Sequence, residues 1–127
     1  TKDDRLFKMA MFAYRKLKVY QKSLLWVMDV YRLCSSFPNE EKFALVSQVR
    51  RAAVSVTSNI AEGMSRSSSK EVLHFLEISF GSLMEVQSQM EIAQLLNYIT
   101  KEQMDDLDEK TIEIAKMLSG LKAAKKS

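Results

Sequence analysis

Glycine, proline and cysteine are scarce in this sequence, and each scarcity excludes a class of structure. Three glycines and one proline among 127 residues cannot build the many tight turns of an all-β fold. A single cysteine, Cys34, excludes an internal disulfide and a thiolate metal cage, and it fits the reducing cytoplasm. Long helices with few connections are therefore expected, within one domain that spans residues 1–127.

Long apolar runs are also missing, most clearly at the start of the chain. The first twenty residues carry eight charged side chains: Lys2, Asp3, Asp4, Arg5, Lys8, Arg15, Lys16 and Lys18. Charges at this density interrupt the apolar core of a signal peptide and any membrane span. We therefore expect a soluble, cytoplasmic protein with no membrane partner.

Charge is unevenly distributed, although the net charge is only +3. Residues 1–35 hold eight lysine and arginine residues against three acids, whereas residues 71–100 hold four glutamates and no lysine or arginine. One interpretation is that oppositely charged helices are neighbours, or that they neutralise one another across an interface. The other is a basic surface that holds nucleic-acid phosphates, for which the small net charge is weak support.

Apolar residues at intervals of three and four predict the first two helices. The first runs from about residue 17 to about residue 35, and its stripe is Leu17, Tyr20, Leu24, Val27, Met28, Tyr31 and Cys34. Pro38 disfavours helix at Phe37 but fits the first turn of the second helix. The stripe of that helix is Val46, Val49, Ala53, Val56 and Ile60, with Phe43 at its border. Gly63 is expected to end it in the left-handed conformation.

Two capping boxes, Ser68-x-x-Glu71 and Thr100-x-x-Gln103, mark the starts of two further helices. The third covers about residues 69–97, with the stripe Val72, Leu76, Phe80, Leu83, Val86, Met90 and Ala93. The fourth covers about residues 101–119, with the stripe Met104, Leu107, Thr111, Ile114 and Leu118. Gly120 is expected to close it, leaving residues 120–127 as a polar tail and residues 1–16 as an arm of unassigned structure. The pattern predicts an all-α, antiparallel up-and-down four-helix bundle.

The third helix carries more apolar surface than one core needs. Ile78, Ile92 and Leu96 fall on the side of the helix opposite its main stripe. Gly81, in the middle of the helix, costs about 1 kcal/mol relative to alanine and so indicates a close contact. We therefore expect a further buried face supplied by another copy of the chain, with Ile78, Ile92 and Leu96 in the oligomer interface.

Residues that could perform catalysis or bind metal do not form a set. His74 is the only histidine, and it lacks the partners that a metal site or a base-assisted nucleophile needs. Only Glu71-x-x-His74 has the spacing of di-iron bundles, which require a repeated pair. Cys34 ends the first stripe, as expected of a small core residue. We therefore expect no enzyme activity, no metal, no cofactor and no small-molecule substrate.

Seven basic residues are candidates for contact with nucleic-acid phosphate. They are Lys16, Lys18, Lys22, Arg50, Arg51, Arg66 and Lys70. Basic side chains of this kind supply the contacts that hold a nucleic-acid backbone. The alternative is a structural role, because Arg51 and Arg66 could equally pair with Glu62 or with the acidic third helix.

Several sequence blocks carry a resemblance to a known family. They are Phe37-Pro38-Asn39-Glu40-Glu41, the stretch from Ser47 to Val56, Ser58-Asn59-Ile60-Ala61-Glu62-Gly63 with Arg66, and the stretch from Gly81 to Val86. With the earlier Leu17 to Ser23 and the periodicity of the fourth helix, they make residues 17–119 resemble the proteins encoded within intervening sequences of bacterial 23S rRNA genes. Thr57 stands where that family often has proline, and Ser79-Phe80 replaces a more usual small pair.

The resemblance implies a fold, an assembly and a place for the motif residues. Members of the family form antiparallel four-helix bundles, and the resemblance implies a ring-like homo-oligomer, a pentamer. Asn59, Glu62, Gly63 and Arg66 are expected where the second helix ends. Their polar groups would satisfy the last carbonyls of the helix and the backbone of the loop.

Two functions are compatible with the sequence, and both stay open. A distantly similar bundle, the accessory protein of diversity-generating retroelements, binds nucleic acid and a reverse transcriptase. The resemblance therefore favours RNA or a nucleic-acid-processing protein as partner, by analogy of fold. The first hypothesis is a non-enzymatic, oligomeric bundle whose basic residues contact RNA. The alternative is a structural or scaffold module for protein–protein interaction that binds no nucleic acid.

Overall fold

Five α-helices and two short 3-10 turns make up the computed structural model, which describes residues 1–126. The helices are α1 (Lys2–Met11), α2 (Lys18–Cys34), α3 (Leu45–Met64), α4 (Ser69–Leu95) and α5 (Lys101–Lys126). The 3-10 turns are η1 (Ala13–Lys16) and η2 (Asn39–Glu41). Residues 1–126 contain no strand, and the predicted all-α class is confirmed.

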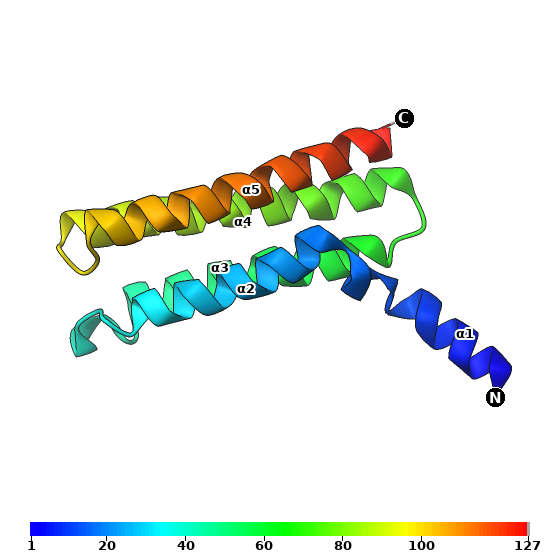
Figure 1. Ribbon diagram of the computed structural model, residues 1–127, viewed down its shortest axis with the longest axis horizontal. Helices are drawn as coiled ribbons and strands as arrows, with labels where there is room; N and C mark the ends of the chain where they lie inside the picture. Colours follow the sequence, from blue (N-terminus) through cyan, green and yellow to red (C-terminus); the bar gives the residue numbers. More distant parts are fainter. Residues whose placement is uncertain (127) are drawn as a thin grey trace.

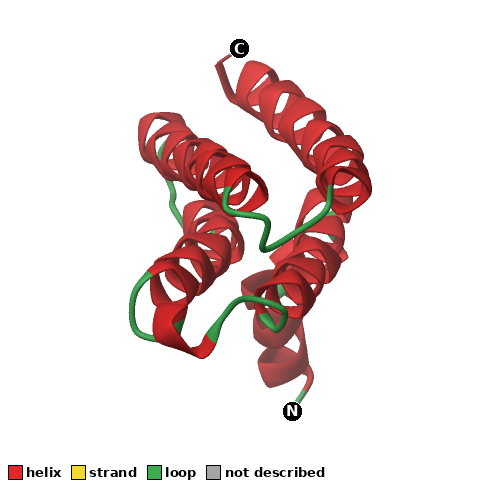
Figure 2. Ribbon diagram, turned by 90° about the vertical axis from the view of Figure 1, so that its left-hand side faces the viewer, coloured by secondary structure: helices red, strands yellow, loops and turns green. Residues whose placement is uncertain are grey.

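Helices α2 to α5 run alternately up and down in two layers. Figure 1 shows α2 beside α3 in one layer and α4 beside α5 in the other, and Figure 2 shows the bundle end-on. α2 lies next to α3 and α5, and α4 lies next to the same two helices, whereas α2 and α4 are not adjacent. The predicted antiparallel bundle is confirmed. The basic segment 1–35 and the acidic segment 71–100 are not neighbours within one chain, so the first part of that interpretation of the charge pattern is wrong, while neutralisation across an interface stays a prediction.

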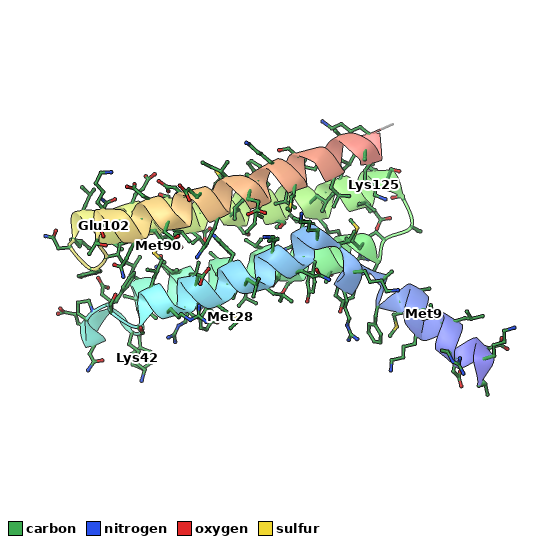
Figure 3. All side chains as sticks on the ribbon, viewed as in Figure 1. Met9, Met28, Lys42, Met90, Glu102 and Lys125 are labelled. Atoms are coloured by element: carbon green, nitrogen blue, oxygen red, sulfur yellow. The ribbon has the colours of Figure 1, made fainter. Side chains whose placement is uncertain are left out.

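The predicted stripes of α3, α4 and α5 form most of the core. Their buried members are Val46, Val49, Ala53, Val56, Ile60, Val72, Leu76, Leu83, Val86, Met90, Ala93, Met104, Leu107, Thr111, Ile114 and Leu118. Figure 3 shows Met90 between the two layers. Phe80 is partly buried against this core, but Phe43 is 89% exposed and does not border it.

The stripe predicted for α2 is confirmed only in part, because Cys34 is buried and Leu17, Tyr20 and Val27 are partly buried against the core, whereas its other three members are exposed. The residues of α2 that are buried are Val19, Ser23, Trp26, Val30 and Cys34. The predicted Leu24, Met28 and Tyr31 are exposed. This helix has apolar side chains on two sides, and the side that carries Trp26 packs against α5. Trp26 donates a hydrogen bond from Nε1 to Thr111 Oγ1 at 3.0 Å in the interior.

Both predicted capping pairs lie at helix starts, but only Thr100 and Gln103 form the complete reciprocal box. Ser68 Oγ accepts a hydrogen bond from the Glu71 N–H at 3.2 Å, and Thr100 Oγ1 accepts one from the Gln103 N–H at 3.1 Å. Gln103 Oε1 completes the second box by accepting the Thr100 N–H at 2.9 Å. These bonds satisfy donors that the first turn of a helix leaves free. Asn97, with φ of 64°, supplies the left-handed residue after α4.

Gly63 and Gly120 do not end helices as predicted. Gly63 lies inside α3 and is buried, and a Cβ there would meet Phe75 Cβ at 2.9 Å. It permits the close approach of α3 to α4 instead of ending a helix. Gly120 also lies inside a helix, because α5 continues to Lys126. Residues 120–126 of the predicted tail are therefore helical, and Ser127 lies outside the described residues. Around Gly81 the space is open, so the predicted close contact is not made within residues 1–126, and a contact with another copy stays a prediction.

Residues 1–16, which the sequence pattern leaves unassigned, form α1 and η1. Thr1 caps α1 by accepting a hydrogen bond from the Asp4 N–H at 3.1 Å. In Figure 1, α1 projects from the bundle at the end where α2 begins.

Among the helices of residues 1–126, none combines the length and the apolar character needed to cross a membrane.

Candidate functional site

The structure divides the seven basic candidates into three groups and does not bring them onto one surface. Arg50 and Arg51 lie on α3 beside the C-terminal half of α2. Lys22 and Arg66 are held in ion pairs by glutamates. The last three are exposed at the other end of the bundle, where α2 and α4 begin: Lys16, Lys18 and Lys70.

A shallow groove between α2 and α3 gathers cations and aromatic rings. Its volume is about 490 Å³. It is lined by Tyr31, Lys42, Phe43, Ser47, Arg50, Arg51 and Val54. No carboxylate is among these lining residues. We call it the basic–aromatic groove, and Figure 3 places its Lys42 at the end of the bundle opposite Met9 of α1.

The chain between α2 and α3 creates one wall of this groove. Pro38 begins the η2 turn, and α3 starts only at Leu45, later than a start directly after Pro38 would require. The backbone of Ala44, with φ of −117° and ψ of −104°, separates the turn from the helix. Phe43 precedes this break and therefore lies outside the helix, with its ring in solvent.

Cations lie over aromatic rings along the groove. The guanidinium carbon of Arg50 is 4.9 Å from the centre of the Tyr31 ring, and Lys42 Nζ is 5.4 Å from the centre of the Phe43 ring. Each cation is attracted by the electron-rich face of its ring. Such a contact positions a positive charge without neutralising it, so the charge remains available to an anion.

The positive charge of the basic–aromatic groove has no partner of opposite sign in residues 1–126. Arg51 donates a hydrogen bond to the uncharged Ser47 Oγ at 3.3 Å, and Arg50 Nε is buried without a hydrogen bond. Burial raises the pKa of the nearby Cys34 thiol to about 11, although the charge of Arg50 acts in the opposite direction. The thiol is therefore protonated at neutral pH and does not neutralise Arg50.

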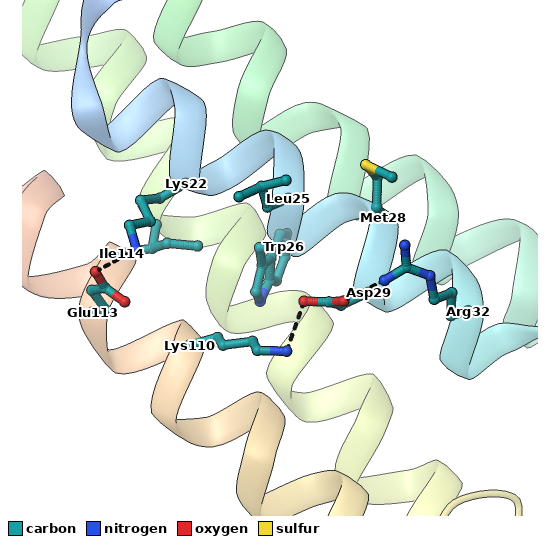
Figure 4. Close-up of a pocket in the computed structure, with 9 residues that line it drawn as sticks. All are labelled: Lys22, Leu25, Trp26, Met28, Asp29, Arg32, Lys110, Glu113 and Ile114. Carbon is teal, nitrogen blue, oxygen red and sulfur yellow. Dashed lines mark hydrogen bonds and ion pairs between the residues drawn. The ribbon is translucent and has the colours of Figure 1, made fainter.

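A second groove, between α2 and α5, has a different electrostatic character (Figure 4). Its volume is about 380 Å³, and it is lined by Lys22, Leu25, Trp26, Met28, Asp29, Arg32, Lys110, Glu113 and Ile114. Asp29 accepts hydrogen bonds from Lys110 Nζ and from Arg32 Nη1, both at 2.9 Å. Lys22 Nζ lies 3.3 Å from the carboxylate of Glu113. We call it the ion-paired groove.

The charges of the ion-paired groove connect two helices. Hydrogen bonds to Asp29 on α2 and to Asp106 on α5 raise the pKa of Lys110 above its ordinary value of 10.5. Each carboxylate keeps the ammonium in its charged form, and the ammonium in turn reduces the negative potential. This arrangement stabilises the contact between α2 and α5 and leaves little net charge for a ligand.

Of the family-motif residues, Asn59 does not lie at the turn. Its side-chain amide donates to the carbonyl of Ser55 at 2.8 Å and to Ser55 Oγ at 2.9 Å, one turn earlier in α3. The prediction that it satisfies the last carbonyls or the loop is wrong. The same Ser55 hydroxyl lies 2.8 Å from that of Ser82 on α4, so Asn59 belongs to a polar contact between the two helices.

Glu62 and Arg66 lie at the end of α3 and reach α4. They form an ion pair with a distance of 3.0 Å, and the Arg66 guanidinium carbon is 4.7 Å from the centre of the Phe75 ring. The carbonyl of Glu62 is satisfied by the backbone N–H and the hydroxyl of Ser65, and that of Gly63 by the backbone N–H of Arg66. The motif side chains therefore connect α3 to α4, while local groups cap the helix.

The predicted interface residues lie on the outward side of α4. Ile78 is 38% exposed, Ile92 is 47% exposed and Leu96 is 49% exposed in the single chain. Their position agrees with the helical pattern. Their role in an oligomer stays a prediction.

The residues considered for catalysis lie apart from one another. His74 is exposed, with its ring centre 5.6 Å from that of Phe75, while Cys34 is buried in the core. Within the described chain, no three side chains among His, Cys, Asp and Glu come together in a way that could hold a metal ion.

Sequence reasoning missed three members of the basic–aromatic groove: Tyr31, Lys42 and Phe43. Tyr31 was assigned to the core stripe of α2, and Phe43 to the border of the next stripe. One signal does point to the groove. Positions 43, 47, 50 and 54 follow one another at intervals of four, three and four, which on a continuous helix would align an aromatic ring with Arg50 along one edge.

Comparison with known proteins identifies relatives of the bundle. A family model described as 23S rRNA-intervening sequence protein matches residues 15–120, which confirms the resemblance. A crystal structure of a protein of unknown function from the S23 ribosomal protein family of Bacteroides thetaiotaomicron superposes with a TM-score of 0.75 at 28% identity. The match covers 82% of this chain and 97% of that chain. No curated protein matches.

Proposed function

We propose that this chain, which belongs to the 23S rRNA-intervening sequence protein family, binds single-stranded RNA in the basic–aromatic groove. It would act as a non-catalytic, oligomeric binding protein in the cytoplasm. The single buried cysteine supports a reducing compartment. The separation of His74 from Cys34 supports a role without catalysis, because a nucleophile needs a base within hydrogen-bonding reach.

The observation that carries the proposal is the presence of three unpaired cations beside two aromatic rings. Lys42, Arg50 and Arg51 have no carboxylate partner in the described chain, so phosphate oxygens would not have to compete with one. Non-specific affinity for nucleic acid comes mainly from such neutralisation of phosphate charge.

The exposed ring of Phe43 favours a single strand over a duplex. A side chain that is 89% exposed offers a free aromatic face, on which an unpaired base can stack. Bases in a duplex are already stacked on one another and present only their edges. The combination of a stacking ring with cations for the backbone is typical of proteins that bind single strands without reading their sequence.

The other candidate residues provide weaker support. Lys22 is already paired with Glu113, and Arg66 with Glu62, so binding phosphate would require breaking an ion pair. Lys16, Lys18 and Lys70 are exposed at the end of the bundle remote from the groove. They would extend a binding surface only across neighbouring subunits.

The test is a titration of the whole chain with labelled single-stranded and duplex RNA at several salt concentrations, followed by fluorescence anisotropy. Three phosphate contacts predict a slope of about −2 in log affinity against log salt for the single strand. Arg51→Glu should weaken binding strongly. Lys101→Glu is the matched control, because it makes the same charge change at an exposed position of α5.

Three results would contradict the proposal. The first is no affinity for single-stranded RNA even at low salt. The second is an equal loss of affinity in the Arg51 and Lys101 variants. The third is equal affinity for single strand and duplex, which would indicate only non-specific attraction of charge.

A second function, a scaffold assembled from several copies, is favoured by the outward face of α4. Ile78, Ile92 and Leu96 leave apolar surface exposed on one side of the single chain. Family resemblance makes a pentamer the expected form. Multi-angle light scattering measures the subunit count, and a monodisperse monomer at all concentrations would contradict this part of the proposal.

A further inference from the structure

The N-terminal helix α1 has no partner within its own chain. None of its ten residues is buried. Its large apolar side chains are exposed, at 53% for Leu6, 70% for Phe7, 53% for Met9 and 50% for Met11. A helix this short is marginally stable in water by itself. Packing of these side chains on another surface would remove them from water and stabilise the helix.

The outward face of α4 also has no partner, and its length and composition match α1. Its exposed apolar side chains are Ile78, Met84, Ile92, Leu95 and Leu96. From Ile78 to Leu96 the helix rises about 27 Å, and the ten residues of α1 span about 15 Å. One α1 helix therefore fits along this face with room at its ends.

The two surfaces carry opposite charge. Residues 1–16 contain five lysine and arginine residues and two acids, whereas residues 71–100 contain four glutamates and no lysine or arginine. Glu77, Glu85 and Glu91 are exposed on α4 and form no ion pair in residues 1–126. Arg5 and Lys8 of α1 likewise have none. Complementary charge of this kind steers association and selects its orientation.

The arm cannot easily use the face on its own chain. α1 continues into η1 and α2, and α2 lies diagonally opposite α4 and is not adjacent to it. Figure 1 shows α1 leaving the bundle on the side of α2 and α3, away from α4 and α5. A second copy can present its α4 face to the arm without any rearrangement of the bundle.

We infer that α1 of one copy docks on the outward face of α4 of a second copy. The inference rests on the assembly part of the proposed function and is independent of RNA binding. α1 lies outside residues 15–120, the range that the family model matches. This contact would therefore cover the α4 face of the proposed assembly with a segment that the matched bundle does not include.

Two single substitutions test the contact from its two sides, with the subunit count measured by sedimentation velocity. Phe7→Asp changes the arm, and Ile92→Asp changes the α4 face; neither residue belongs to the core. Each should weaken self-association roughly tenfold or more, since a large apolar side chain is lost and a charge is introduced. Ile112→Asp is the control, at a 53% exposed position of α5 outside both surfaces.

A mixture of the two variants distinguishes contact between copies from contact within one chain. Phe7→Asp chains keep an intact α4 face, and Ile92→Asp chains keep an intact arm. An equimolar mixture should therefore regain part of the association that each variant lacks alone. A mixture that behaves like the sum of the two variants would overturn docking between copies.

The remaining outcomes separate this inference from the proposed assembly. If Phe7→Asp assembles like the unmodified chain, the arm contact is wrong while the assembly stands. If the unmodified chain is a monomer, both are wrong. If Ile112→Asp loses association as strongly as the other variants, the effect is not specific to the two surfaces and the inference fails.

Discussion

The two grooves that flank α2 contain the same number of cations but differ in their acids. The basic–aromatic groove has Lys42, Arg50 and Arg51 with no carboxylate, whereas the ion-paired groove has three cations with two carboxylates. Lys42 and Arg50 of the first lie over rings, and the cations of the second are held by Asp29 and Glu113. The count of lysine and arginine in a segment therefore does not identify a binding surface. The position of the acids does.

The largest expected effect separates the grooves by RNA affinity. Phe43→Ala removes the exposed ring of the basic–aromatic groove and should cost about 1–3 kcal/mol of binding to single-stranded RNA, the usual contribution of one stacked base. Met28→Ala shortens an exposed apolar side chain of the ion-paired groove and should change affinity less than about twofold. Anisotropy titrations of both variants test this, and equal losses would remove the distinction between the grooves.

The second prediction concerns stability, which should depend on the ion-paired groove. Trp26→Phe removes the donor to Thr111 Oγ1 and leaves a buried hydroxyl without its partner, at a cost of about 1–3 kcal/mol. Urea unfolding followed by circular dichroism measures the change. RNA affinity should stay the same, and a parallel loss of affinity would show that the two grooves are coupled.

The third prediction concerns a substitution that makes the charges of the two grooves more alike. Asp29→Asn keeps the shape of the side chain but removes the carboxylate shared by Lys110 and Arg32. RNA binding should gain salt dependence, with the slope in log affinity against log salt steeper by about 1 for each cation released. The loss of exposed ion pairs should cost about 0–1 kcal/mol of stability. An unchanged slope would mean that these cations cannot reach the bound RNA.

The smallest effect is a pH dependence of the ion-paired groove. The pKa of Lys110 is higher in the folded protein than its ordinary 10.5, so its ion pairs stabilise the fold fully below 10.5 and are lost as the pH rises above that value. Lys110→Met should therefore lose less stability than the unmodified chain as the pH rises above 10.5. Comparing the two chains separates Lys110 from Tyr98 and Cys34, whose pKa values are also raised. Identical pH profiles would contradict the assignment.

Most of the fold could be predicted because α3, α4 and α5 each have one dominant apolar stripe. α2 has apolar residues on two faces, and nothing in its spacing shows that Trp26 and Val30 face the core while Leu24 and Met28 do not. Glycine was the other source of error. Gly63 allows a close helix contact, which depends on the position of Phe75 far along the chain and not on the local sequence.

The candidate site could be predicted only in part. Arg50 and Arg51 are adjacent in sequence and were recognisable as a basic pair. Lys42 and Phe43 join them because the backbone conformation of Ala44 separates them from α3, and this segment lies beside α2. The pairing of Lys22 with Glu113 depends on the packing of α2 against α5, and it removes a residue that the sequence pattern presents as free.

Trp26 provides an internal optical probe for every variant above except Trp26→Phe. It is the only tryptophan of the chain, it is 1% exposed, and it lies where α2 meets α5. Its emission should shift to longer wavelength when water reaches the indole, so one spectrum reports whether a variant keeps α2 in place. Substitutions in α1, at Phe43 or on the outward face of α4 should leave that spectrum unchanged, and a loss of binding or assembly can then be attributed to the altered surface.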